Sequence, residues 1–391
     1  MRVGILSEYP PYNFGGIGPF TQSLSEALAR EGVEVVVIAP HPKNRPFRVF
    51  DRNHRLKILW LPMGPLMPRH MWFQLKNADL IRREVSDCDI IHGQDIYSYP
   101  LLELFKRNGL KTPWVITFHT NPQAELYYAL KSRLRGTNLG DILVFGAGFP
   151  VWDMTVREHS RHAERLVCVT KSLRDELSDG YALDKERIRV IHTCVNVDGI
   201  RRDLGSRPHR HNDGRVRLFY AGRLYYRKGI LHLIRILDRL AEEPDGKKFT
   251  LSVFGEGPLR LTVKKYAAEH LPMGSIKIRG YVDRGTFLQE LSGSDIFCLP
   301  SLYEACPMAM IEAMSLGKPV IAFNLPFARE ILGSNIELLA SDANDYRIKL
   351  SRLISSPEER ARLSHGLLER SENFDSSKIA AEYRELYKEL I

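Results

Sequence analysis

Short apolar segments alternate with amphipathic stretches along almost the whole chain, and this alternation constrains the fold more than any other feature. The apolar segments of the first half are rich in Val, Ile and Leu, which is typical of strands that are buried on both faces and therefore parallel. They are residues 3–7, 33–39, 56–61, 90–94, 115–119, 166–170 and 188–192. Helical stretches such as 20–30 and 171–177 lie between them. Repeated strand, helix and strand predict an open, doubly wound α/β sheet.

A polar segment without apolar periodicity, residues 201–215, interrupts this pattern and predicts an interdomain linker. The alternation then restarts with strands at 218–221, 250–254, 276–280, 296–300 and 320–323. One helix of this half, 230–241, has an apolar face, and 376–391 is also amphipathic. We therefore expect two Rossmann-like doubly wound α/β domains, residues 1–200 and 216–375, that face a central cleft. Ligands of such sheets bind beyond the carboxyl ends of the strands.

The charge balance of the 391-residue chain, a net +9, indicates an anionic partner. A nucleotide is the first expectation and a membrane surface the second, while no motif indicates nucleic acid binding. The five cysteines are scattered and form no C-x-x-C pair, which fits a reducing cytosol. We find neither a signal peptide nor an apolar run of the ~20 residues that span a bilayer.

The segment 300–314 (PSLYEACPMAMIEAM) carries the strongest chemical signal. It follows an apolar strand, and Pro307 is placed to be the first residue of a helix that ends at Gly317. The N-terminus of such a helix offers free N–H groups to a phosphate. Glu304 precedes the helix and Glu312 lies within it, so that one carboxylate can hold sugar hydroxyls and the other a ribose. The alternative is a helix-start acid and a surface residue.

A second segment, 221–229 (AGRLYYRKG), lies between a strand and a helix. Arg227 and Lys228 stand at the N-terminus of that helix, where cations are unfavourable, and Arg223 adds a third positive charge. A diphosphate between these side chains would relieve the repulsion. The alternative is a solvated run of charges.

Three further features are compatible with ligand binding. The turn at 255–258 (GEGP) lets backbone approach a ligand closely, and Gly15-Gly16 follows the first strand in the position of a phosphate-binding loop. His119 ends a strand at the expected carboxyl edge, where a catalytic and a structural role are equally compatible with the sequence. We find no H-E-x-x-H and no paired-Cys motif, so we expect no metal and no other cofactor.

Taken together and in this order, the motifs resemble those of the family 4 retaining glycosyltransferases, which have the GT-B fold. The resemblance spans residues 3–330 and rests on Glu304-x7-Glu312 with the following 313–321 (AMSLGKPVI), on Gly222-Arg223-x4-Lys228-Gly229, on 255–258 (GEGP) and 280–282 (GYV), and on Gly15-Gly16 and His119. The chain departs from the family at Ala305-Cys306-Pro307, where the family usually has Gly-Phe-Gly, and this changes how backbone meets the donor sugar.

The resemblance implies a catalytic set and a donor-binding set. Arg223 and Lys228 would bind the donor diphosphate, while Glu304 would contact the donor sugar near the reacting carbon. Glu312 would hold the ribose, and His119 would touch the transferred sugar. The catalytic set is then Glu304, His119, Arg223 and Lys228, and the donor-binding set is Gly15, Gly16, Arg223, Lys228, Gly255, Tyr281, Val282, Glu304, Cys306, Met308, Ala309 and Glu312.

The resemblance also implies a mechanism, namely front-face attack with retention at the anomeric carbon and without a covalent intermediate. The departing diphosphate would help to deprotonate the acceptor, and the two cations with the helix N-terminus before Met308 would stabilise its charge. Domain closure over the donor is expected, and no metal is required. In this family the final helix, here 376–391, often crosses back to the first domain.

The partners predicted in this way are a UDP-, GDP- or ADP-sugar donor of hexose type and a sugar or lipid-linked acceptor. Two segments of the first half, 62–73 and 123–152, read as irregular and mix Met and aromatic residues with Arg and Lys. They indicate either contact with an anionic membrane or core packing and a lid. We expect a cytoplasmic enzyme, with a peripheral position at the inner membrane face as a variant. The alternatives are a nucleotide-sugar epimerase and a non-catalytic nucleotide-sugar-binding module.

Overall fold

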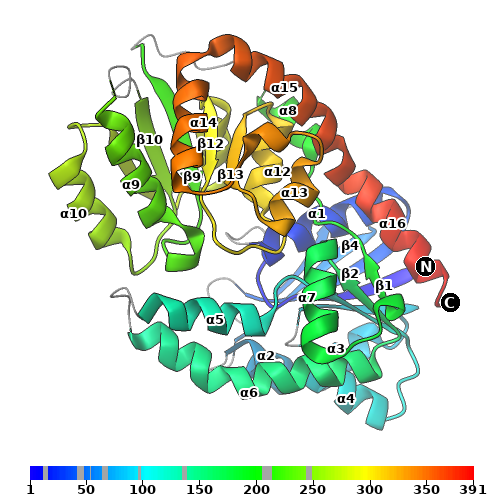
Figure 1. Ribbon diagram of the computed structural model, residues 1–391. Helices are drawn as coiled ribbons and strands as arrows, with labels where there is room; N and C mark the ends of the chain where they lie inside the picture. The colour runs from blue at the N-terminus through cyan, green and yellow to red at the C-terminus, as the bar shows by residue number, and fades with distance from the viewer. Residues whose placement is uncertain are drawn as a thin grey trace. The chain divides into compact units, whose positions relative to one another are not determined.

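The computed structural model describes residues 1–11, 16–41, 48–52, 54–63, 69–95, 98–133, 139–204, 214–243 and 249–391. Contacts divide the chain into two units. The first unit comprises Met1–Gln123, Ala147–Asn196 and Phe374–Ile391, and the second comprises Ala124–Gly146 and Val197–Asn373. Each unit has a sheet flanked by helices, as Figure 1 shows, which confirms the predicted α/β class with two Rossmann-like domains.

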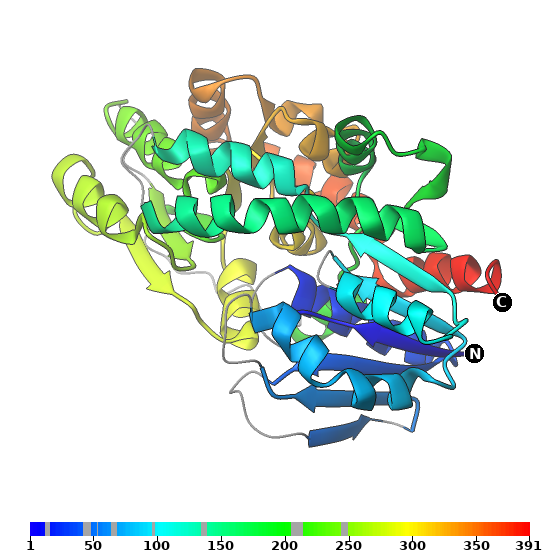
Figure 2. The same ribbon diagram turned by 90° about the horizontal axis from the view of Figure 1, so that it is seen from below.

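The sheet of the first unit has eight strands in the order β3-β4-β2-β1-β5-β6-β7-β8. All of its pairings are parallel except that of β3 with β4. The strands are β1 (Arg2–Leu6), β2 (Glu34–Pro40), β3 (Arg48–Arg52), β4 (Leu56–Leu61), β5 (Ile90–Gln94), β6 (Trp114–Phe118), β7 (Arg165–Cys168) and β8 (Ile188–Val190). The antiparallel β3 was not predicted, because its sequence RVFDR lacks a continuous apolar run. It lies at the outer edge of the sheet (Figure 2).

The helices of this part of the chain correct the prediction of two irregular segments. They are α1 (Ile17–Arg30), α2 (Arg69–Lys76), α3 (Ala78–Val85), α4 (Tyr99–Arg107), α5 (Pro122–Arg133), α6 (Leu139–His162) and α7 (Lys171–Tyr181). Part of 62–73 is therefore helical, and 123–152 is largely covered by α5 and α6. The glycines and Pro150 read as breakers, yet α6 continues through Pro150. Tertiary context overrides local propensity at such a position.

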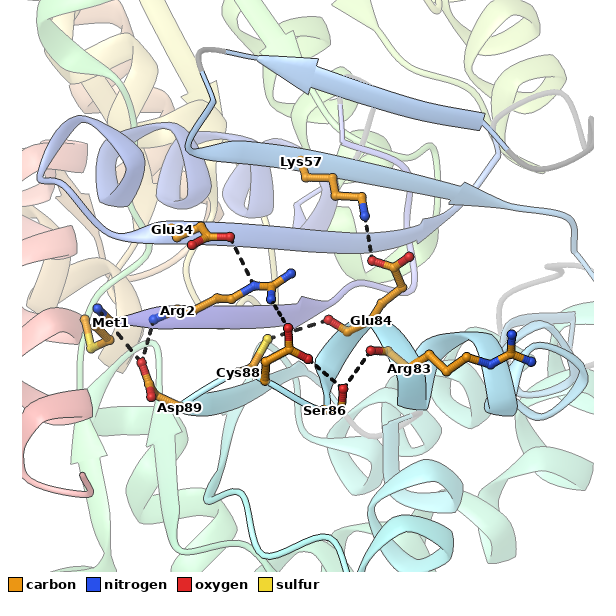
Figure 3. Close-up of polar contacts among 10 residues, drawn as sticks. Met1, Arg2, Glu34, Lys57, Arg83, Glu84, Ser86, Cys88 and Asp89 are labelled. Atoms are coloured by element: carbon orange, nitrogen blue, oxygen red, sulfur yellow. Dashed lines mark hydrogen bonds and ion pairs between the residues drawn. The ribbon is translucent and has the colours of Figure 1, made fainter.

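Ion pairs join the amino ends of the strands in the first unit (Figure 3). The Arg2 guanidinium contacts Glu34 at 3.2 Å and Asp87 at 2.5 Å, and the Arg2 backbone N–H donates to Asp89. These contacts connect β1, β2 and the turn before β5. They lie at the amino edge of the sheet, whereas ligands of such sheets bind at the opposite, carboxyl edge.

The sheet of the second unit has six strands in the order β11-β10-β9-β12-β13-β14, and all of its pairings are parallel. The strands are β9 (Val216–Ala221), β10 (Phe249–Phe254), β11 (Ile276–Gly280), β12 (Ile296–Leu299), β13 (Val320–Phe323) and β14 (Leu339–Ala340). Chain order reverses between β9 and β12, which makes this pair the switch point of a doubly wound sheet. The two-residue β14 was too short to be predicted.

Three helices of the second unit begin at side-chain caps. Asp283, Asp342 and Ser356 accept hydrogen bonds from backbone N–H groups of α11, α14 and α15. Buried apolar residues line one face of α9, as predicted. The helices are α8 (Val197–Leu204), α9 (Ile230–Ala241), α10 (Arg260–His270), α11 (Arg284–Ser292), α12 (Met308–Ser315), α13 (Pro326–Leu332), α14 (Ala343–Ser355) and α15 (Pro357–Ser371).

The chain passes between the units at 123/124, 146/147, 196/197 and 373/374. After the third passage, helix α8 covers residues 201–204, where an irregular linker was expected, and residues 205–213 of that linker lie outside the described residues. At the last passage, Val195 and Asp375 form a parallel bridge within the first unit. Helix α16 (Ser376–Lys388) then packs against α1 (Figure 1), in agreement with the expectation that the final helix returns to the first domain.

Candidate active site

Two loops leave the carboxyl ends of β9 and β12 at the switch point of the second sheet. The first loop runs through Gly222, Arg223 and Lys228 to α9, and the second runs from Pro300 through Glu304 to α12. A backbone hydrogen bond joins them, because the Leu302 N–H donates to the Arg227 carbonyl at 2.8 Å. The two strongest motifs of the sequence therefore lie side by side where such sheets bind ligands.

Gly229 allows the two loops to approach this closely. It has φ +70° at the N-cap of α9, and a Cβ there would lie 1.7 Å from the Pro300 carbonyl oxygen. Only glycine combines a left-handed conformation with the absence of this atom. The contact fixes the start of α9 against the end of β12.

Lys228 and Glu304 form an ion pair at the centre of these loops. The Lys228 Nζ lies 2.6 Å from both carboxylate oxygens of Glu304, and the Ser301 hydroxyl donates to one of them at 2.9 Å. The two side chains are only 17% and 9% exposed, so this lysine is not part of a solvated run of charges. Burial lowers the pKa of Lys228, and the carboxylate opposes that shift.

The two arginines of the first loop differ in their surroundings. Arg223 is exposed, whereas Arg227 pairs with Glu125 of α5 at 3.0 Å. Tyr128 of the same helix stacks on Tyr303, with ring centroids 5.6 Å apart. Glu125 and Glu304 thus relieve part of the repulsion that suggested a diphosphate. Neither pair was predicted, because nothing in the sequence around Arg227 or Lys228 identifies a distant partner.

Glu312 lies in α12 and is almost fully buried, which excludes the alternative that it is a surface residue. Its carboxylate contacts the Arg284 guanidinium of α11 at 2.5 Å. The Arg284 side chain is 47% exposed, so it can move without unfolding its surroundings. A ribose that uses both oxygens of Glu312 must share or displace this arginine.

The start of α12 differs by one residue from the prediction. Pro307 has φ −73° and ψ 109° and is therefore the N-cap rather than the first helical residue. Its extended ψ starts the helix at Met308, and it has no side-chain acceptor for the first-turn N–H groups of Met308 and Ala309. Those groups are suited to an anion. Cys306 is half-buried beside them, and Gly317 has φ +65° just after the helix, as expected.

The remaining donor-binding candidates of this unit lie on neighbouring strand ends. Gly255 follows β10 with φ +129°, and a Cβ there would lie 2.0 Å from the Gly222 carbonyl oxygen. The Gly255 N–H donates to the Gly280 carbonyl at the end of β11. Tyr281, which is 57% exposed, and Val282 come directly afterwards. One edge of the sheet thus carries all of the predicted donor-binding residues of the second unit.

The candidates of the first unit lie at the carboxyl edge of its own sheet. Gly16 is the N-cap of α1, while Gly15 lies outside the described residues. His119 directly follows β6, and its Nε2 lies 2.8 Å from the Gln94 amide oxygen. Its ring packs edge-on against Phe20 at 4.7 Å. Burial lowers the pKa of His119 to about 3, so the imidazole is neutral at neutral pH.

Among the residues that the structure describes, no group of three or more His, Cys, Asp or Glu side chains could hold a metal ion. Asp87 and Asp89, on either side of Cys88, accept hydrogen bonds from Arg2 at the amino edge of the first sheet (Figure 3). Within the same residues, no helix is both long and apolar enough to cross a membrane.

Comparisons with known proteins identify the family of this chain. Residues 14–198 match Glycosyltransferase Family 4, and residues 202–366 match Glycosyl transferases group 1. Glycogen synthase of Mycobacterium tuberculosis is 27% identical over 83% of this chain and 78% of its own length. Alpha-monoglucosyldiacylglycerol synthase of Streptococcus pneumoniae is 24% identical over 86% of this chain and 74% of its own length.

Among solved structures, sucrose-phosphate synthase from Thermosynechococcus elongatus has the same fold. It has a TM-score of 0.76 and 20% identity, and the likeness covers 100% of this chain and 98% of that one. The two family matches together span both units and include every predicted site residue. The chain belongs to the group 1 glycosyltransferases of glycosyltransferase family 4, enzymes that use nucleotide-sugar donors.

Proposed function

We propose that this glycosyltransferase moves a hexose from a nucleoside diphosphate sugar to a hydroxyl of a sugar or lipid-linked acceptor, with retention at the anomeric carbon. The observation that carries the proposal is the buried Lys228–Glu304 pair at the switch point of the second sheet. In this proposal Lys228 is the cation for the diphosphate, and Glu304, which it contacts, is the carboxylate for the sugar hydroxyls. Both stand beside the N-terminus of α12, which favours negative charge.

In this proposal the donor rearranges contacts that the protein already makes. The diphosphate binds Lys228, Arg223 and the first-turn N–H groups of α12. Glu304 then accepts hydrogen bonds from hydroxyls of the donor sugar, and Glu312 holds the ribose in place of Arg284. The backbone after β11, at Tyr281 and Val282, supports the base. The preformed cations stabilise the leaving group at little reorganisation cost.

The reaction is a substitution on one face of the sugar. The bond from the anomeric carbon to the phosphate oxygen breaks with its electron pair, and the acceptor oxygen bonds to the same face. The acceptor proton passes to the departing phosphate oxygen. Glu304 is held by Lys228 and Ser301, which favours a positioning role over that of a covalent nucleophile. The name of the S. pneumoniae relative, which specifies an alpha-glucosyl lipid, supports retention and a hexose.

Two kinds of acceptor are supported by the relatives. One is named for glycogen, a sugar polymer, and the other for a glucosyl lipid. The net charge of +9 also suits an anionic membrane surface next to a lipid acceptor. Membership in the family favours transfer over the epimerase and the binding module.

The first experiment measures nucleoside diphosphate release from a panel of UDP-, GDP- and ADP-sugars with candidate acceptors. Arg223→Ala is compared with Arg235→Ala, which removes an exposed arginine of α9 away from the loops. Lys228→Met is compared with Lys318→Met, which removes a half-buried lysine whose Nζ donates to the Ser292 carbonyl at 2.6 Å. We expect release from one donor, lost in Arg223→Ala and Lys228→Met and kept in both controls.

Two further measurements separate the alternatives. The anomeric configuration of the product, determined by NMR coupling constants, must equal that of the donor. Inversion would refute the front-face mechanism. An epimerised donor without a transfer product would establish the epimerase, and tight donor binding without turnover on any acceptor would establish the binding module.

A further inference from the structure

A row of polar side chains lies inside the first unit, beneath His119. His92 and Gln94 come from β5, Thr117 from β6, and Tyr383 and Tyr387 from α16. All five are fully buried. Central parallel strands normally bury apolar side chains on both faces, and polar groups there are costly unless they are paired. This row therefore calls for an explanation.

The five side chains form one hydrogen-bonded network. His92 Nδ1 lies 2.7 Å from the Tyr387 hydroxyl, and His92 Nε2 lies 2.8 Å from the Thr117 hydroxyl. The Thr117 hydroxyl in turn lies 2.9 Å from that of Tyr383. Gln94 Nε2 lies 3.2 Å from His92 Nε2, and Gln94 Oε1 lies 2.8 Å from His119 Nε2. Gln94 thus connects the buried network to the histidine at the edge of the sheet.

In the structure the Gln94 amide nitrogen faces His92 and the amide oxygen faces His119, and this orientation fixes the donors and acceptors. The Gln94 amide N–H donates to His92 Nε2, so the His92 proton is on Nδ1 and is donated to Tyr387. The Gln94 amide oxygen can only accept, so His119 donates from Nε2–H. Burial lowers the pKa of both histidines to about 3, which keeps both rings neutral and makes the tautomer a defined property.

The tautomer decides which atom His119 offers to a ligand. With the proton on Nε2, Nδ1 is an acceptor, and it has no hydrogen-bond partner in the part of the chain that the structure describes. The network therefore does more than satisfy buried groups. It ends at the half-buried His119 ring at the carboxyl edge of the sheet, and it determines that Nδ1 of this ring is an acceptor.

We propose that Gln94 is a positioning residue that holds His119 in the Nε2–H tautomer, with Nδ1 presented to a substrate hydroxyl, and that Tyr387 of α16 orients Gln94 through His92. This inference rests on the proposed function and on the role that the family resemblance implies for His119, contact with the transferred sugar. It assigns a role in the reaction to the final helix, at the opposite end of the sequence from β5.

The experiment combines NMR of the histidine ring nitrogens with steady-state kinetics in the full chain. His119→Gln assigns the His119 signals in the wild type. Gln94→Leu removes both hydrogen bonds of the amide, Gln94→Glu keeps an oxygen acceptor toward His119, and Tyr387→Phe removes only the hydroxyl at the far end. Tyr346→Phe is the matched control, because its fully buried hydroxyl donates to the Ile321 carbonyl in the second unit.

We expect Nε2–H at His119 in the wild type, Gln94→Glu and Tyr346→Phe, and a mixed tautomer in Gln94→Leu. In Gln94→Leu, kcat should fall by up to about 100-fold at a nearly unchanged donor KM, since a misplaced group costs rate more than binding. Tyr387→Phe should show the same changes to a smaller extent, and it keeps the test valid if Gln94→Leu does not fold.

An unchanged tautomer or an unchanged kcat in folded Gln94→Leu would overturn the inference. If Gln94→Leu fails to fold, the same two results in Tyr387→Phe would overturn it. A wild type that transfers no sugar would refute the proposed function instead, and the tautomer measurement would still decide whether Gln94 controls His119.

Discussion

Replacement of Gly229 by alanine tests whether the contact between the two loops creates the donor site. The left-handed conformation at φ +70° costs an alanine about 1–2 kcal/mol. In addition, the new Cβ would lie 1.7 Å from the Pro300 carbonyl oxygen, so backbone must move by about 1.3 Å to reach the 3.0 Å that real Cβ contacts require. A displacement of about 1 Å at a site costs on the order of 100-fold in rate.

Gly317→Ala is the matched control, because Gly317 has nearly the same φ, +65°. Its Cβ would meet the Ser364 hydroxyl at 2.2 Å, and that side chain can rotate away. Both variants should lose about 1–2 kcal/mol of stability from the backbone conformation. Only Gly229→Ala should also lose kcat/KM by about 100-fold. Asparagine tolerates the left-handed conformation, so Gly229→Asn should remain impaired while Gly317→Asn recovers stability.

The assay is nucleoside diphosphate release with the preferred donor, together with thermal unfolding of each variant. Equal activity of Gly229→Ala and Gly317→Ala would refute the reasoning, because the close approach to Pro300 would then have no bearing on the site. Recovery of activity in Gly229→Asn would show that conformation, and not contact, makes glycine necessary there.

Three further predictions concern single groups. Glu312→Gln should raise the donor KM by about 10- to 100-fold with little change in kcat, because a hydrogen bond to a charged group contributes about 1.5–3 kcal/mol. This variant should also stop discriminating against a donor with a 2′-deoxyribose. The control Glu290→Gln, which removes a carboxylate next to the exposed Arg279, should behave as the wild type. A maleimide should modify Cys306 first, because the other four thiols are buried and burial raises the pKa of Cys88 and Cys298 to about 12. Bound nucleoside diphosphate should protect Cys306 from this modification. Modification of Cys298 before Cys306 in the folded protein would contradict the structure. Burial lowers the pKa of His92, His119 and His159 to about 3, so between pH 6.5 and 3 only the unfolded chain binds protons at these rings. As the pH decreases through this range, the free energy of unfolding should fall by about 1.4 kcal/mol per pH unit for each histidine. Calorimetric proton uptake on unfolding at pH 5 should drop by about one proton in His159→Gln, and an unchanged uptake would disprove the assignment.

The sequence predicted the fold where one signal dominates. Apolar density alone located β4, β5, β11 and β13 at their observed bounds, because a buried parallel strand leaves few other choices for its side chains. The prediction from the sequence failed where two local signals compete. In α6, Pro150 and several glycines suggested an irregular segment, although the helix is continuous. In β3, the charges of an edge strand concealed the strand.

The sequence allowed candidate residues to be assigned to the site, but it did not allow their pairings to be predicted. Lys228 and Glu304 were each assigned to the donor, yet they are 76 residues apart, and their contact depends on β12 lying next to β9. The same holds for Arg284 with Glu312 and for Gln94 with His119. The local sequence does not indicate a contact partner that depends on strand order, whereas it does indicate a turn glycine or a helix cap.

The return of α16 to the first unit has a consequence for how the protein is made. The strands of the first sheet leave the ribosome early, but the helix that supplies Tyr383 and Tyr387 is synthesised after the whole of the second sheet. Until then His92 and Thr117 lack their buried hydroxyl partners. The first unit therefore completes its folding only after the second can already have formed, and truncation of the chain at 373 would leave the earlier half unfinished rather than the later one.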